Sequence, residues 1–140
     1  GIAEVATLTG LKGRWQILQE RPLTICDTGH NEAGIREVMD QLASIPHRKL
    51  HMVFGMVNDK DRSRILNLLP KDAVYYFCQA SLPRALDARV LAEEASQFGL
   101  RGEVIPDVNK ALSKARSAAG SDDIIFIGGS TFVVAEIENL

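Results

Sequence analysis

This 140-residue chain lacks the features that define several large classes of protein. Its only two cysteines, Cys26 and Cys78, lie in apolar runs without Cys-x-x-Cys spacing, which excludes a disulfide framework and indicates reduced core thiols in a cytoplasmic protein. No apolar stretch approaches ~18 residues, so we expect no membrane span. Basic runs and aromatic residues interleaved with basic ones are absent, and the net charge is −2, so nucleic acid is not an expected partner.

Two nucleotide-binding motifs are missing as well. No Gly-x-x-x-x-Gly-Lys-[Ser/Thr] occurs, so the chain lacks the standard phosphate cradle and the usual means of orienting ATP and magnesium for phosphoryl transfer. The dinucleotide fingerprint Gly-x-Gly-x-x-Gly is also absent, because residues 128–134 read Gly-Gly-Ser-Thr-Phe-Val-Val. We therefore do not expect this chain to catalyse phosphoryl transfer from ATP by itself.

What is present is the composition of one globular α/β domain. Apolar residues make up 46% and charged residues 24% of the chain, and the length suits a single domain. Apolar runs predict strands that alternate with helical segments, which indicates βαβ units and a parallel sheet with right-handed crossovers. We expect five such strands and a sixth at an edge, at residues 22–26, 49–57, 73–78, 103–105, 124–127 and, for the edge, 14–18.

Start and stop signals delimit the helices between these strands. Asn31, Asp87 and Asp107 stand where N-caps are expected. After Asn31, apolar residues recur at helical spacing and form one stripe that faces a sheet; they are Ile35, Val38, Met39, Leu42 and Ile45. Further helices are expected at residues 2–11, around Ile65 to Leu69, and at 131–138.

Polar residues follow three of the predicted strands where each strand ends. Asp27 and His30 follow the strand at 22–26, Lys60 lies in the run after the strand at 49–57, and Gly128-Gly129-Ser130 follows the last strand. Ligands of open α/β sheets bind outside the carboxyl ends of the strands. An acid, a histidine, a lysine and a glycine-rich turn at one edge indicate a phosphorylated or carboxylate ligand.

Each of these residues has a simpler interpretation. Asp27 can cap local backbone N–H groups, or it can accept hydrogen bonds from ribose hydroxyls. His30 can be a surface histidine, and the Asp-x-x-His pair can be half of a metal site, although no third ligand is evident. We expect Asp27 and His30 to serve the site rather than the fold, because neither belongs to an apolar stripe.

The remaining polar residues carry weaker signals. Lys60 lies in a run typical of solvated turns but can equally hold an anionic group, and Gly128-Gly129-Ser130 can be a tight turn that needs small residues. Arg14, which precedes its strand, reads as an ordinary surface arginine on sequence alone. His47 and His51 flank the start of a strand and are interpreted as structural or exposed.

Four segments, taken in order, resemble those of a known family. Gly13 to Gln16 resembles a Gly-Arg entry loop, and Asp27 to Asn31 resembles an Asp-x-Ala-His-Asn-Pro turn. Gly55 to Asp61 resembles a Gly…Asp-Lys-Asp segment, and Gly128 to Ser130 a closing Gly-Ser. From about Gly10 onward, the chain is similar to the C-terminal domain of folylpolyglutamate synthase / dihydrofolate synthase, a branch of the Mur ligase superfamily.

Two departures from this family lie beside the matched side chains. The family's alanine is Gly29 here, and its proline after asparagine is Glu32. The resemblance implies a Rossmann-like three-layer fold, with a mostly parallel sheet of about six strands and helices on both faces. It also implies that residues 13–140 form a Mur-ligase-type C-terminal domain, and that residues 1–12 link it to an N-terminal ATPase domain missing from this chain.

The implied activity is that of an ATP-dependent amide ligase. ATP would phosphorylate a carboxylate of folate or dihydropteroate, and the amine of L-glutamate would displace phosphate from the acyl phosphate. The P-loop and the magnesium ligands would belong to the ATPase domain, while this domain would act as a lid that closes over the nucleotide and presents the amino acid.

The resemblance assigns roles to five residues. Arg14 and Asp27 would face ATP, while His30, Lys60 and Ser130 would lie near the incoming glutamate. No catalytic residue and no metal ligand is assigned to this chain. The alternative is a stand-alone nucleotide- or phosphate-binding α/β module without catalysis.

Overall fold

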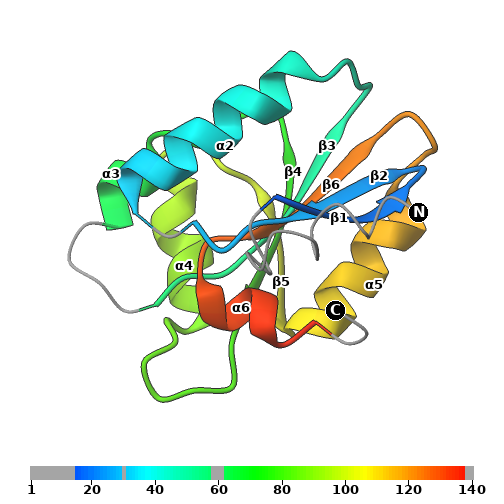
Figure 1. Ribbon diagram of the computed structural model, residues 1–140. Coiled ribbons are helices and arrows are strands. Elements are labelled where there is room, and N and C mark those ends of the chain that lie inside the picture. The colour runs from blue at the N-terminus through cyan, green and yellow to red at the C-terminus, as the bar shows by residue number, and fades with distance from the viewer. Residues whose placement is uncertain (1–14, 30, 58–61, 138–140) are drawn as a thin grey trace.

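One six-stranded sheet organises the molecule (Figure 1). The computed structural model describes residues 15–29, 31–57 and 62–137, apart from the side chains of residues 131 and 132. The strand order is β1-β2-β6-β3-β4-β5, with β1 antiparallel to β2 and every other pair parallel. The strands are β1 Gln16–Glu20, β2 Leu23–Cys26, β3 Leu50–Phe54, β4 Val74–Gln79, β5 Gly102–Asp107 and β6 Ile124–Gly128. The predicted mostly parallel sheet, including its edge strand, is confirmed.

Helices cover both faces of this sheet (Figure 1). The chain steps from β2 through β3 and β4 to β5, and then returns to insert β6 between β2 and β3. Right-handed crossovers place helices that follow opposite steps on opposite faces. One face carries α2 Glu32–Ser44, α3 Arg62–Leu66 and α4 Ala88–Ser96, and the other carries α5 Val108–Ala118 and α6 Thr131–Ala135. Within the described residues, no helix has the length and apolar character needed to cross a membrane.

Alternating side chains of the central strands build two cores. In β6, Ile124 and Phe126 belong to the core under α2, α3 and α4, whereas Ile125 and Ile127 belong to the core under α5 and α6. All five residues of β6 are buried, as are all five of β3. Burial on both faces explains why these strands read as continuous apolar runs without alternation.

Helix starts agree with the predicted caps. The side chain of Asn31 accepts a hydrogen bond from the Gly34 N–H, and Asp87 and Asp107 cap α4 and α5 in the same way. The predicted strand at 49–57 is shorter, because after Phe54 the chain leaves the sheet and Val57 pairs with Ala85 instead.

Other boundaries differ or lie outside the described residues. The α3 helix ends at Leu66, because residues 67–69 continue as turns before Pro70. The predicted helix at 2–11 and the predicted turn at 58–61 fall outside the described residues.

A buried polar cluster joins the amino ends of β3 and β6. The carboxylate of Asp123 contacts His51 Nε2 at 2.9 Å and accepts two hydrogen bonds from Arg48, each at 3.1 Å. His51 Nδ1 lies 3.1 Å from the hydroxyl of Tyr76, and the Gly120 N–H donates to Asp123. Burial raises the pKa of Asp123, but the Gly120, His51 and Arg48 contacts outweigh burial and lower it overall. His51 is therefore structural, one of the two interpretations that the sequence allowed, whereas His47 is exposed.

Candidate functional site

The sheet order brings two predicted site residues to the same edge. Asp27 directly follows β2, and Ser130 follows β6, the neighbouring strand. Arg14, His30 and Lys60 lie outside the described residues, so their predicted roles remain predictions.

Asp27 is a buried carboxylate that holds two main-chain segments. Its side chain accepts the Trp15 N–H at Oδ2, 2.8 Å away, and the Gly29 N–H at Oδ1, 2.7 Å away. Its own N–H donates to the carbonyl of Ile127 in β6. The residue is 3% exposed and holds the main chain in place, so Asp27 serves the fold, contrary to the expectation that it serves the site rather than the fold. A carboxylate accepts up to about four hydrogen bonds, so these contacts are compatible with a ribose hydroxyl as a further donor.

Trp15, which Asp27 holds, has a strained backbone. Its φ of 44° lies in the left-handed region, which is unusual for a bulky residue. Such strain persists only where surrounding contacts fix it, and it gathers at ligand sites and switch regions. Trp15 directly follows Arg14 and is partly buried against the core. It is the chain's only tryptophan, so it can report on this edge by fluorescence.

The glycine-rich turn after β6 is shaped by backbone packing. Gly129 has φ of +100°, and a Cβ there would clash with the carbonyl oxygen of Gly55. A Cβ on Gly55 would lie 2.7 Å from the carbonyl oxygen of Cys78. Small residues are therefore required for packing, which supports the tight-turn interpretation of this segment. Ser130, at the end of the turn, is 1% exposed.

The described residues fit the nucleoside part of a nucleotide better than its phosphates. The carboxylate of Asp27 can accept hydrogen bonds from hydroxyl donors. The amino terminus of α2 is already capped by Asn31 and carries Glu32 in its first turn, which disfavours an anion there. Among the described ranges, no group of three His, Cys, Asp or Glu side chains could hold a metal ion.

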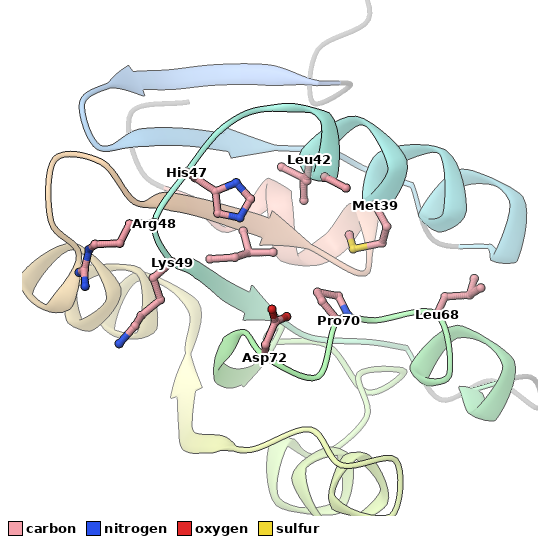
Figure 2. A pocket seen from close by; sticks show the side chains of 10 residues that line it. Met39, Leu42, His47, Arg48, Lys49, Leu68, Pro70 and Asp72 are labelled. Atoms are coloured by element: carbon pink, nitrogen blue, oxygen red, sulfur yellow. The ribbon is translucent and has the colours of Figure 1, made fainter.

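A hollow of about 430 Å³ lies away from this edge, between α2 and the segment that leads into β4 (Figure 2). Its apolar side is formed by Met39, Leu42, Ala43, Leu50, Leu68 and Pro70. Its polar rim is formed by His47, Arg48, Lys49 and Asp72. Figure 2 shows the charged ends of Arg48 and Lys49 directed away from the apolar side. No predicted site residue lines this hollow, so we place the candidate site at the carboxyl edge.

Sequence reasoning missed the loop between β4 and α4, which joins the same edge. The Leu86 N–H donates to the carbonyl of Met56, and the N–H and hydroxyl of Ser81 both donate to the Glu136 carboxylate beyond α6. The loop is thereby tied to the segment after β3 and to α6. These contacts span more than 25 residues along the chain, so no local pattern signals them.

The fold is that of a Rossmann-like α/β domain, with the candidate site at the carboxyl ends of its parallel strands. A sequence profile of the Mur ligase, glutamate ligase domain family matches residues 13–131. The chain therefore belongs to this family.

Three relatives illustrate the relationship. The "probable bifunctional folylpolyglutamate synthase/dihydropteroate synthase" of Haloferax volcanii is 31% identical over 125 residues, which are 89% of this chain and 15% of that protein. The UDP-N-acetylmuramoyl-L-alanyl-D-glutamate–2,6-diaminopimelate ligase of Wolinella succinogenes is 30% identical over 88 residues, 61% of this chain and 20% of that protein.

The third relative is a solved structure. The crystal structure of a bifunctional folylpolyglutamate synthase/dihydrofolate synthase with Mn, AMPPNP and L-glutamate bound superposes with a TM-score of 0.80 and 32% identity. The superposition covers 89% of this chain and 30% of that one. The predicted resemblance is confirmed, and the chain spans less than a third of the length of each relative.

Proposed function

We propose that this chain is the C-terminal domain of an ATP-dependent ligase that adds L-glutamate to folate or dihydropteroate through an acyl phosphate. The observation that carries this proposal is the superposition of nearly the whole chain on an enzyme solved with AMPPNP and L-glutamate bound. Residues 13–140 form the domain, and a separate ATPase domain in the same ligase supplies the P-loop and the magnesium ligands.

The carboxyl edge divides into two parts in this proposal. Asp27 fixes the Trp15 and Gly29 amides and accepts a hydrogen bond from the nucleoside, and Arg14 adds a positive charge beside it. His30, Lys60 and Ser130 position the glutamate, for which a lysine ammonium suits a carboxylate as a point charge. ATP, when bound, supplies the phosphoryl group that activates the acceptor carboxylate for attack by the glutamate amine.

A folate-type acceptor is favoured over a cell-wall precursor by the extent of similarity. The Haloferax relative is 31% identical over 89% of this chain, whereas the cell-wall ligases that align over a comparable share of it, 86% and 91%, are 25% identical. The alternative of a stand-alone nucleotide- or phosphate-binding module needs no second substrate. Dependence of ATP turnover on both glutamate and a folate acceptor separates these candidates.

Kinetics of the full-length ligase test the division of the edge. Lys60→Ala should raise the KM for glutamate at least about tenfold and that for ATP less, since a charge-assisted contact contributes roughly 1.5–3 kcal/mol. Asp27→Ala should show the opposite bias, toward ATP. Lys49→Ala, at the hollow on the opposite edge, is the matched lysine control and should change neither constant. If Lys60→Ala and Asp27→Ala both weaken ATP alone, the residue assignments are wrong even though the family stands.

A further inference from the structure

The hollow between α2 and the segment that leads into β4 has walls that hydrogen bonds hold in place (Figure 2). On one side, the Arg48 N–H donates to the carbonyl of Asp122 at 2.9 Å, which fixes the segment between α2 and β3. On the other side, the hydroxyl of Tyr75 in β4 donates to the carbonyl of Pro70. The chain itself therefore shapes this hollow, as is usual for small-molecule sites, which are largely pre-formed.

The size and the apolar side of the hollow suit a ring-sized ligand. Its volume of about 430 Å³ falls within the roughly 300–1,000 Å³ typical of ligand pockets. Met39 and Leu68 are only partly buried against the core, so each leaves apolar surface uncovered at the hollow. The unbranched methionine side chain adapts to the shape of an apolar partner and makes favourable contacts with aromatic rings.

Two hydrogen-bond acceptors lie at the rim, and one of them is charged. The carboxylate of Asp72 has no hydrogen bond or ion pair with any residue that the structure describes, and Figure 2 shows it directed into the hollow. Burial first, and the charge of Asp72 second, raise the pKa of the Tyr75 hydroxyl behind the wall. His47 Nδ1 lies 2.7 Å from the carbonyl oxygen of Ile45 and so carries a hydrogen, which leaves Nε2 of the neutral ring as the second acceptor.

The cations around the rim are engaged or directed elsewhere. Arg48 donates two hydrogen bonds to Asp123, and Figure 2 shows the ammonium of Lys49 directed away from the apolar side. The side chain of Lys71 runs over Gly99, where an added Cβ would lie 3.5 to 3.9 Å from three of its carbon atoms. The unbalanced charge at the hollow is therefore negative.

We propose that this hollow binds a small aromatic cation, with its ring on Met39 and Leu68 and an amidinium or guanidinium group on the carboxylate of Asp72. Planar groups of this kind bind carboxylates through two parallel hydrogen bonds, which adds geometric selectivity to the charge. An anionic ligand is disfavoured, because Asp72 would repel it. The hollow lies at the amino edge of the sheet, so this second site does not depend on the function proposed for the carboxyl edge.

Titration of the ¹⁵N-labelled chain with benzamidine tests the site directly. We expect the amide resonances of Ala43, Leu50 and Asp72 to shift. Asp72→Asn, at an exposed position, should weaken binding about tenfold, because a charge-assisted pair is lost. Benzamide has the same ring without the charge and should bind at least about tenfold more weakly than benzamidine. Glu93→Gln, which removes an exposed carboxylate on α4, is the matched control and should leave binding unchanged.

A second variant tests the apolar side without altering a charge. Ala43 is exposed on α2 and lines the hollow, so Ala43→Phe should fill the space and abolish binding while the core stays intact. Undiminished binding by Ala43→Phe or Asp72→Asn would overturn the site, as would equal binding of benzamide and benzamidine. Shifts that gather instead around Glu37 and Asp40, on the acidic surface of α2, would show a general attraction of the cation to carboxylates and would also overturn it.

Discussion

Asp27 holds two main-chain segments through one buried side chain. Two main-chain N–H groups donate to its carboxylate, and one of them belongs to Trp15, whose backbone is strained. A cap interpretation was open from the sequence, because Gly29 is a local partner. The contact with Trp15 could not be predicted from the sequence, since it joins residues 12 positions apart through a backbone amide that carries no sequence signature.

Removal of the Asp27 carboxylate should destabilise the chain. Because hydrogen bonds to charged groups contribute roughly 1.5–3 kcal/mol each, Asp27→Ala should lower the free energy of unfolding by at least about 2 kcal/mol. Asp27→Asn retains one acceptor oxygen and should lower the free energy of unfolding by less than Asp27→Ala does. Urea unfolding followed by circular dichroism measures both. Asp40→Ala, at an exposed position of α2, is the control; a loss at Asp27→Ala no larger than at this control would refute the structural role.

Gly129 is the second residue whose identity the backbone dictates. An L side chain at φ of +100° is strained, and its Cβ would overlap the Gly55 carbonyl oxygen. Gly129→Ala should therefore destabilise the chain by about 3 kcal/mol or more. At Gly120 the nearest heavy atom to an added Cβ is 3.6 Å away, so Gly120→Ala should stay within about 1 kcal/mol. Equal thermal stability of the two variants would show that the turn tolerates a different backbone.

At the scale of elements, local signals predicted where the helices and strands lie better than they predicted where each one ends. The caps at Asn31, Asp87 and Asp107 follow from short-range chemistry, and the apolar runs predicted the five parallel strands. The edge strand β1 lies two residues later than the predicted 14–18. The end of β3 at Phe54 could not be predicted from local residues, because the following segment leaves the sheet and Val57 pairs with Ala85, far along the chain. The insertion of β6 between β2 and β3 is likewise a property of the whole sheet.

An ion pair joins α3 to α4 and makes their packing depend on pH. Arg62 donates to both oxygens of Glu94, at 2.8 and 2.7 Å, and these hydrogen bonds lower the pKa of Glu94 below its ordinary 4.5. Because the folded pKa is depressed, the pair's stabilisation is fully present above about pH 4.5 and is lost as the pH falls through the folded pKa.

Glu94→Gln should therefore lower the free energy of unfolding by about 1 kcal/mol at pH 7, and the gap from the unsubstituted chain should close in acid, as the pH falls through the lowered pKa of Glu94. Urea titrations of both proteins at neutral and at acid pH make the comparison. Glu93→Gln, at the exposed neighbouring position, should show neither effect. A difference that persists unchanged in acid would mean that the Glu94 charge does not contribute through this pair.

At the scale of the molecule, the fold was predictable and the long-range polar contacts were not. Alternating strands and helices predicted the three layers, since each pattern depends on a few consecutive residues. The cluster of His51, Tyr76 and Asp123 joins three separate segments, so only the packed structure reveals it. At the candidate site, topology predicted the edge for Asp27 and Ser130. The loop between β4 and α4, in contrast, is anchored by Glu136 after α6 and by the segment after β3, which no local pattern reveals.

Two complete cores and a continuous sheet predict that the chain folds without another domain. Thermal unfolding of the 140-residue chain should be cooperative, with coincident transitions in circular dichroism and Trp15 fluorescence. ATP hydrolysis in the presence of folate and glutamate should be absent, because the chain lacks a phosphate cradle. Turnover by the purified chain would contradict the assignment of the chemistry to a separate domain.

The most direct test of the account is ADP formation by the full-length ligase, measured with and without L-glutamate and a folate-type acceptor. We predict that turnover requires both substrates and falls more than about tenfold in Ser130→Ala and Asp27→Asn, while Lys49→Ala on the opposite edge retains the parental rate. Turnover that is independent of glutamate, or that fails in Lys49→Ala and survives in the carboxyl-edge variants, would contradict the account.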